Sequence, residues 1–277
     1  MTRLVAVPNV SEGRDSGVLD AIGTAFAAHA DVLHRSEDAD HHRAVFFLAG
    51  EPGRLHLALA AGAAEAAARI DLRAHDGLHP RVGALDVAPV VFLDEAARGA
   101  AIAEALLAAD AIGRAGIPVF LYGELAGGRT RAELRRGGPA GLAERGTPPD
   151  YGPPELHPSA GATLVAARPP LIAFNVALAP PATLDDARAI AAVIRAPAMP
   201  GVRALGLHLE RQDVVQVSTN IEDHRAVTAA AVLEAVRARA PVAGAELVAP
   251  APAAALAGWP TDVELRMPGS IEALLDR

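Results

Sequence analysis

Hydrophobic and polar positions in the first half of the chain follow two different periods. Short apolar runs bounded by polar or glycine-rich turns are typical of strands, whereas apolar residues three or four apart are typical of amphipathic helices. Pro52 stands in the first turn of one such helix, where its missing N–H is tolerated. The pattern predicts strands at Leu4–Pro8, Val32–His34, Ala44–Ala49, Val87–Phe92 and Val119–Tyr122, and helices at Val18–Ala28, Gly53–Ala68 and Glu95–Ile112.

The second half repeats this order. It predicts strands at Leu171–Leu178, Ala204–Leu209, Val214–Thr219 and Glu246–Ala249, and helices at Thr183–Ile194 and Arg225–Ala238, the latter capped by Asp223. Each half is therefore a β-α-β-β-α-β unit. We predict an α/β (α+β) fold of two ferredoxin-like halves, residues 1–167 and 168–277, joined at Arg168-Pro169-Pro170. A single larger α/β sheet is the alternative.

One segment, Arg129–Ser159, does not fit a tightly packed element. It is rich in glycine, proline and arginine, and contains the run Thr147-Pro-Pro-Asp-Tyr-Gly-Pro-Pro154. Long connections inside compact domains are frequently functional. We expect a long loop with a role at the site, and a flexible surface connection is the alternative.

Composition narrows the class of protein. Of the 277 residues, 51% are hydrophobic, which allows a packed core. The chain has no cysteine, which excludes disulfides and thiolate metal sites and favours the cytoplasm. It has no lysine, so a Schiff-base enzyme and a P-loop are excluded. The net charge of -8 argues against nucleic acid as a partner. Apolar runs are too short for a signal peptide or a membrane helix, so no membrane partner is expected.

The loop from Arg73 to Val87 carries the densest chemistry. Glycine and proline exclude a regular helix there, while two histidines, two aspartates and two arginines lie close in sequence. Histidine is the usual proton carrier near neutral pH, and arginine binds carboxylates through paired N–H donors. The alternative is a loop with merely hydrogen-bonded surface histidines. His75 and His79 have metal-ligand spacing only on a helix, and the His41-His42 pair is no stronger, so we predict no metal.

Further polar clusters stand at the ends of predicted strands. They are Pro8–Gly13, Glu37–Arg43 and Gln216–Asn220. Each alone is typical of an ordinary turn, but their shared placement at strand ends suggests a common cleft. No Gly-x-Ser-x-Gly, His-Glu-x-x-His or Gly-x-Gly-x-x-Gly motif is present, which leaves serine hydrolysis, zinc proteolysis and Rossmann binding without support.

Seven ordered blocks resemble the glutamate formiminotransferase family. They run in order along the chain from residue 4 to about residue 250, which makes the set far more specific than any one block. The blocks are Val7–Gly13, Leu78–Val87, Ile117–Glu124, Pro149–Pro153, His157–Thr163, Leu171–Asn175 and Gln216–Asn220.

The resemblance implies two similar α/β halves with a cleft between them, and transfer of a formimino group from N-formiminoglutamate to N5 of tetrahydrofolate, a step of histidine breakdown. One histidine can take the proton from N5 and give one to the departing nitrogen. By resemblance this residue is His79, and tetrahydrofolate, as co-substrate without a metal, lies along Gly152, Pro153, Pro154, Glu155, Leu156, His157, Pro158, Ser159, Ala160 and Gly161. For the substrates, Arg43, Arg81 and Arg168 are the candidates for the carboxylates, Glu37 is the candidate for the formimino cation, and Asn9 completes the predicted set.

Two positions depart from the family's pattern. Leu78 stands where the family usually has glutamate before its His-Pro-Arg, and His42 stands where it usually has asparagine. Asp76 or Asp86 is then the candidate to orient His79. We expect a single-function form without the cyclodeaminase domain of some relatives, with a homodimer as the candidate assembly. The alternatives are formyl transfer from N-formylglutamate, a non-catalytic folate-binding protein, and a structural subunit.

Overall fold

The computed structural model describes residues 3–195, 197–267 and 269–276. The chain folds into two compact units, Met1–Arg168 and Pro169–Arg277, each with its own sheet and hydrophobic core. The units therefore separate between Arg168 and Pro169, and the structure has two sheets instead of the single larger sheet that was the alternative. The predicted α/β class is confirmed.

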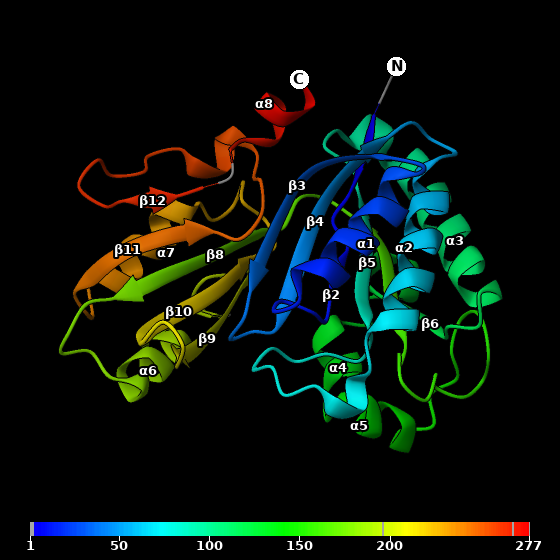
Figure 1. The fold of residues 1–277 in the computed structure, drawn as a ribbon. Coiled ribbons are helices and arrows are strands. Elements are labelled where there is room, and N and C mark those ends of the chain that lie inside the picture. The colour runs from blue at the N-terminus through cyan, green and yellow to red at the C-terminus, as the bar shows by residue number, and fades with distance from the viewer. Residues whose placement is uncertain (1–2, 196, 268, 277) are drawn as a thin grey trace. The chain divides into compact units, whose positions relative to one another are not determined.

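The sheet of the first unit is antiparallel on one side and parallel on the other (Figure 1). β4 pairs antiparallel with β3 on one edge and with β1 and β2 on the other, and β1 and β2 pair with β5. Beyond β5 the chain adds β7 and β6, both parallel. The strands are β1 (Leu4–Ala6), β2 (Asn9–Val10), β3 (Asp31–Asp38), β4 (Arg43–Gly50), β5 (Leu85–Val91), β6 (Val119–Leu121) and β7 (Thr163–Arg168).

Three long helices pack side by side on the first sheet: α1 (Ser16–Ala27), α2 (Leu55–Arg69) and α3 (Arg98–Arg114) (Figure 1). The side chains that these helices bury are the apolar residues that recur three or four apart in the sequence. Phe26 of α1 is fully buried against Phe46 of β4, with ring centroids 5.1 Å apart. Burying one such side chain contributes about 1.5–3 kcal/mol relative to leaving it exposed. Single-turn 3₁₀ helices lie at Leu72–Ala74, Glu95–Ala97 and Gly123–Ala126.

The segment predicted as one long loop is partly helical, so that expectation is wrong for its first half. It contains α4 (Arg131–Arg135) and α5 (Gly138–Glu144). Thr130 and Glu133 form a reciprocal capping box at the start of α4, which satisfies two backbone donors. Leu134 and Leu142 are buried with Phe120 in a small separate cluster. The capping box and the burial of these two leucines hold α4 and α5 in place, and the composition of the segment indicates neither.

The second unit has the element order β-α-β-β-α-β followed by a short tail. β8 pairs antiparallel with β10 and β11, and β10 pairs antiparallel with β9, giving the sheet order β12-β11-β8-β10-β9. The elements are β8 (Ile172–Leu178), α6 (Leu184–Ile194), β9 (Val202–Leu209), β10 (Val214–Ile221), α7 (Ala229–Arg237), β11 (Val242–Leu247), a 3₁₀ turn at Ala253–Leu256, β12 (Leu265–Arg266) and α8 (Ile271–Leu275).

Alternation along the strands gives this second sheet two different faces. Phe174, Val176 and Val217 are buried in the core with the helices. Asn175 and Gln216 occupy the alternate positions and so point to the opposite face. The helix predicted from Arg225 begins later, at Ala229, because Thr228 caps it by accepting from the backbone of Ala231. The predicted cap Asp223 instead accepts from the backbone N–H of Arg225, before the helix begins.

Candidate functional site

His79 lies in the loop between Leu72–Ala74 and β5, and its imidazole has two polar neighbours. Nδ1 is 2.7 Å from the carbonyl oxygen of Pro80 and 3.0 Å from Nη1 of Arg43. Burial among protein atoms, and then the positive charge of Arg43, lower the pKa of His79 well below the ordinary 6.5. The imidazole is therefore neutral at pH 7. Among the described residues, its Nε2 has no hydrogen-bond partner, so this nitrogen is available to a substrate.

Asp86, in β5, holds two arginines beside His79. Its side chain is fully buried and accepts from the backbone N–H of Val82 at 2.7 Å, from Nη1 of Arg43 at 2.8 Å and from Nη2 of Arg135. Burial alone raises the pKa of Asp86, but Arg135 and Arg43 together hold it well below its ordinary range. The buried carboxylate is thus ionised and fixes both cations.

Arg43 opens β4 and links Asp86 and His79 to β2. Its Nε donates to Oδ1 of Asn9 at 2.9 Å, and Nδ2 of Asn9 donates to the carbonyl of Val7. Burial lowers the pKa of Arg43 to about 10, so the guanidinium remains charged at neutral pH. The structure therefore brings together three of the predicted residues, Asn9, Arg43 and His79, around a carboxylate.

Arg81 shapes the loop that carries His79. Its guanidinium donates to the carbonyls of His75 at 2.5 Å, Gly77 at 2.8 Å and His79 at 3.2 Å. Gly77 is required there, because a Cβ would stand 2.4 Å from the carbonyl oxygen of His41. Arg81 thus already uses several of its donors on the loop backbone, and its predicted role in holding a substrate carboxylate stays a prediction.

His75, in the loop that carries His79, stacks on His42, and both imidazoles are neutral. Their ring centroids lie 4.2 Å apart. Nε2 of His75 donates to the carbonyl of His42 at 3.0 Å, and Nδ1 accepts from the backbone N–H of Gly77 at 3.1 Å. Burial, followed by Arg81, lowers the pKa of His75 to about 4. Both ring nitrogens of His75 are engaged in these bonds, which leaves His79 as the histidine of this loop with an open nitrogen.

The two departures from the family's pattern have distinct surroundings. His42 has a φ of +49°, a left-handed conformation that asparagine adopts more easily than most residues. The side chain of Leu78 is 48% exposed and supplies no carboxylate to His79. Of the two aspartates considered as substitutes, Asp76 pairs with Arg14 at 2.6 Å, whereas Asp86 reaches His79 through Arg43. Asp86 is therefore the carboxylate associated with His79.

The predicted folate segment is tied to both ends of the His79 loop. Within it, His157 and Gly161 exchange two backbone hydrogen bonds of 2.9 Å. The backbone N–H of Leu72 donates to Ser159, and that of Ala84 donates to Ala160. Gly161 has a φ of +67°, and a Cβ there would lie 2.1 Å from the carbonyl oxygen of Val82. The turn at 157–161 thus lies against the loop that carries His79.

Glu37 and Arg168 are the remaining predicted substrate-binding residues. Glu37, in β3, pairs with Nε of Arg35 at 3.1 Å. Arg168 ends β7 and the first unit, and its carbonyl accepts from the backbone of Phe92. Their roles stay predictions.

Sequence reasoning did not single out Arg135, which reaches Asp86 from α4. The signal that would have placed it is the Thr-x-x-Glu capping box at Thr130–Glu133, which predicts a helix carrying Arg135 one turn later.

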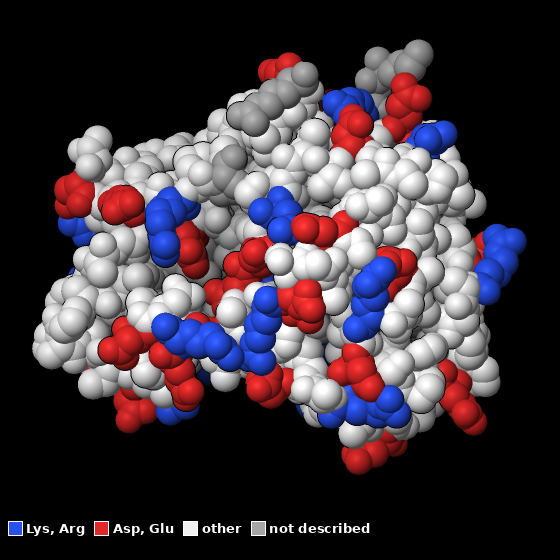
Figure 2. All heavy atoms as spheres, in the orientation of Figure 1, with Lys and Arg blue, Asp and Glu red and all other residues white. Residues whose placement is uncertain are grey.

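Figure 2 shows arginine and acidic side chains interspersed on the face in view. No group of three or more His, Asp or Glu side chains within the described residues is placed to hold a metal ion. In the same part of the chain, no helix is both long and apolar enough to cross a bilayer.

Comparison with known proteins adds what geometry alone does not settle. Residues 3–168 match the family described as the formiminotransferase domain, N-terminal subdomain. The chain belongs to the formiminotransferase family. A glutamate formimidoyltransferase of Streptococcus pyogenes is 34% identical, with 92% of this chain and 91% of that protein aligned. One of Thermoplasma acidophilum is 32% identical, over 87% of this chain and 83% of that protein.

Other relatives in this family are longer. The formimidoyltransferase-cyclodeaminase of Rattus norvegicus is 36% identical over 92% of this chain, but the match covers only 51% of that protein. The chain thus spans about half the length of the relatives with the double name and most of the length of those with the single name. The predicted family, and with it a transferase, is confirmed.

Proposed function

We propose that this protein transfers the formimino group of N-formimino-L-glutamate to N5 of tetrahydrofolate, with His79 as the proton carrier. The observation that carries the proposal is the neutral imidazole of His79, held at Nδ1 and open at Nε2, in a chain whose full-length relatives are named glutamate formimidoyltransferases. The same names support formimino transfer in preference to formyl transfer.

His79 moves one proton between the two substrates. With Nδ1–H donating to Pro80, Nε2 carries the lone pair and takes the proton of N5 as N5 bonds to the amidine carbon. The tetrahedral intermediate then breaks its bond to the glutamate nitrogen, which receives that proton from Nε2. Because burial, and then the charge of Arg43, lower the pKa of His79, the imidazolium is more acidic than an ordinary one and returns its proton readily.

We propose that Arg43 also binds a substrate carboxylate. Its Nε donates to Asn9 and its Nη1 donates to Asp86, whereas Nη2 has no hydrogen-bond partner among the described residues. A carboxylate on Nη2 would lie within reach of His79. Arg81, Arg168 and Glu37 are proposed for the remaining substrate charges, and Gly152–Gly161 for tetrahydrofolate, because the turn at 157–161 adjoins the His79 loop.

The direct test is an anaerobic assay of purified protein with formiminoglutamate and tetrahydrofolate. We expect 5-formiminotetrahydrofolate and free glutamate in equal amounts. If N-formylglutamate supports turnover and formiminoglutamate does not, the protein is a formyltransferase. Folate binding without any turnover would indicate a binding protein. No product and no folate binding would reject the proposal.

Activity should not depend on a divalent metal, since the reaction needs only proton transfer and fixed charges. Turnover after exhaustive chelation is expected to equal that of the untreated protein. If chelation abolishes turnover and one added metal restores it, a metal participates and the mechanism above is wrong.

The capping box of α4 should affect catalysis, because this helix carries Arg135 to Asp86. Thr130→Ala is expected to lower stability by about 0.5–2 kcal/mol, seen as a lower urea midpoint, and to reduce kcat. Thr183→Ala removes the equivalent capping box of α6 in the second unit and is the matched control. It should cost similar stability with kcat unchanged; equal losses of kcat in both variants would contradict a role for α4.

We further propose that the enzyme acts in the cytoplasm, on small molecules alone, and we take a homodimer as the assembly to test. The absence of cysteine and the net charge of -8 support the compartment and the lack of a nucleic-acid partner.

A further inference from the structure

A second histidine, His41, lies beside His79 in the first unit, and the mechanism above does not use it. The two imidazole rings are tilted by 53°, with their centroids 6.2 Å apart. His41 belongs to the turn between β3 and β4, and this turn is bonded to the loop that carries His79. The backbone N–H of Leu78 donates to the carbonyl of Asp40 at 3.2 Å. This bond holds the turn and the loop together, and with them the two rings.

Asp38, at the end of β3, fixes the tautomer of His41. Its Oδ1 lies 3.1 Å from Nδ1 of His41, and it also accepts from the backbone N–H groups of Asp40 at 2.9 Å and His41 at 2.8 Å. Burial raises the pKa of Asp38, but these hydrogen bonds together hold it below its ordinary value. The carboxylate is therefore ionised at neutral pH and accepts the Nδ1 proton of His41. A neutral imidazole that donates through Nδ1 has its lone pair on Nε2.

Nε2 of His41 is thus an unused acceptor. It has no hydrogen-bond partner among the described residues, although the side chain is only 11% exposed. Polar atoms in such surroundings normally have a partner. Nε2 of His79 is open as well, so each of the two neighbouring rings offers one lone pair. The rings are close enough for one small group to lie within hydrogen-bond reach of both nitrogens, about 2.6–3.2 Å from each.

An acceptor at this place suits a formimino group better than a formyl group. The formimino group is an amidine, which is protonated in water at neutral pH and then carries N–H donors on both nitrogens. A formyl group has nearly the same size but ends in a carbonyl oxygen, which only accepts. The lone pair of His41 pairs with the first and is left unpaired against the second. The carboxylate of Asp38 adds to this preference, because it attracts a positive charge.

We propose that His41 binds the terminal N–H of the formimino group and so selects the formimino donor over the formyl donor. The inference rests on the proposed function, in which His79 carries the N5 proton of the same reaction. No proton moves to His41 in this role, and no bond to it forms. Glu37, proposed above for a substrate charge, acts on charge alone, whereas His41 distinguishes N–H from oxygen at the end of the group.

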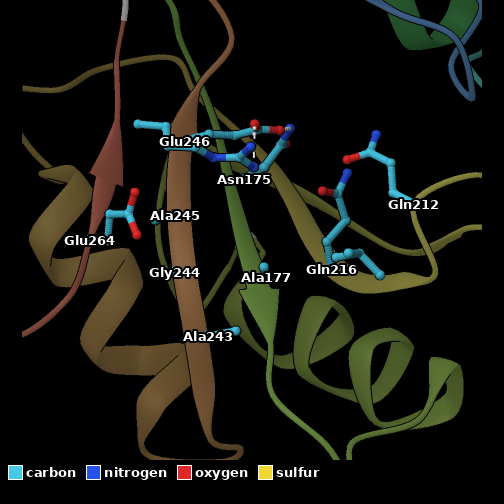
Figure 3. A pocket seen from close by; sticks show the side chains of 11 residues that line it. Asn175, Ala177, Gln212, Gln216, Ala243, Gly244, Ala245, Glu246 and Glu264 are labelled. Atoms are coloured by element: carbon cyan, nitrogen blue, oxygen red, sulfur yellow. Dashed lines mark hydrogen bonds and ion pairs between the residues drawn. The ribbon is translucent and has the colours of Figure 1, made fainter.

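The polar cavity of the second unit is a separate feature. Its volume is about 380 Å³, and Figure 3 shows side chains that line it, among them Asn175, Gln216 and Glu246. No histidine is present among the described residues of this lining. The substitutions below therefore change none of its side chains.

Calorimetric titration of the whole protein with N-formimino-L-glutamate and with N-formyl-L-glutamate measures the selectivity without turnover. The wild type should bind the formimino compound at least tenfold more tightly. His41→Leu removes the acceptor, and should weaken formiminoglutamate binding at least tenfold, about 1.4 kcal/mol, while N-formylglutamate binding stays the same. His41→Gln carries an amide that can turn to accept or to donate, so it should keep part of the formiminoglutamate affinity and gain affinity for N-formylglutamate. In kinetics with tetrahydrofolate, KM for formiminoglutamate should rise more in His41→Leu than kcat falls.

His34→Gln is the matched control, because it places the same amide at a half-buried histidine of β3 outside the cluster. It should keep the wild-type selectivity. Equal losses for both donors in His41→Leu would show a structural role and overturn the inference. So would a wild-type ratio in both His41 variants, or a wild type that binds both donors equally or neither.

The inference and the proposed function fail in different ways. Selectivity that depends on His41, in a protein without turnover, supports the inference and rejects the proposed function. Turnover with formiminoglutamate, at a selectivity that does not depend on His41, keeps the proposed function and overturns the inference.

Discussion

His79→Ala should lower kcat by about 10² to 10⁴, the range that a positioned proton carrier supplies. The imidazole is the group with an open nitrogen beside Arg43, and its truncation removes the route by which N5 loses its proton. The affinity for tetrahydrofolate should fall less than kcat, because the proton moves only on the way to the transition state. Steady-state kinetics and a folate titration on the same preparation measure both quantities.

The pH profile supplies an independent check. Because the pKa of His79 is held well below 6.5, the wild-type kcat should stay level through neutral pH. It should fall only when the pH drops far enough to protonate His79, which is well below pH 6.5. His34→Ala, which truncates a half-buried histidine of β3 outside the cluster, should leave kcat and the profile unchanged. Full activity in His79→Ala would place the proton carrier elsewhere, with His42 the next residue to test.

The hydrophobic periodicity of the sequence located most of the helices and strands, because their buried faces extend over many residues. The predicted helix Gly53–Ala68 corresponds to α2, and the predicted strand Ala44–Ala49 lies within β4, whose buried positions run almost its whole length. β7 was not predicted, since its alanines resemble helix and loop residues equally well. It lies between β5 and β6, and its strand geometry comes from those two neighbours.

The site was predictable in its residue types but not in its contacts. The blocks around Asn9 and His79 are visible in the sequence, and the structure joins them through Arg43. The link from Asp86 to Arg135 spans 49 residues and depends on where α4 packs. The capping box indicates the helix that carries Arg135, but it does not specify that Arg135 reaches Asp86, because this depends on how Leu134 packs in the core.

Asp86→Asn should destabilise the protein by about 3–5 kcal/mol, the cost of removing one partner from a buried ion pair. The carboxylate is inaccessible to solvent and neutralises Arg43 and Arg135, which would be left as buried charges with a neutral amide. Urea unfolding at pH 7 measures the loss. Asp71→Asn breaks an exposed pair with Arg73 and should leave the urea midpoint nearly unchanged.

The pH dependence of this loss has a definite sign. The folded-state pKa of Asp86 lies well below the ordinary 3.8, so its contribution is complete above about pH 4 and disappears as the pH falls further. The difference between wild type and Asp86→Asn should therefore shrink in acid. Adding Arg135→Met to Asp86→Asn removes one of the two stranded charges and should restore part of the stability. Strictly additive losses in the double variant, or an unchanged midpoint in Asp86→Asn, would show that the carboxylate does not hold these arginines together.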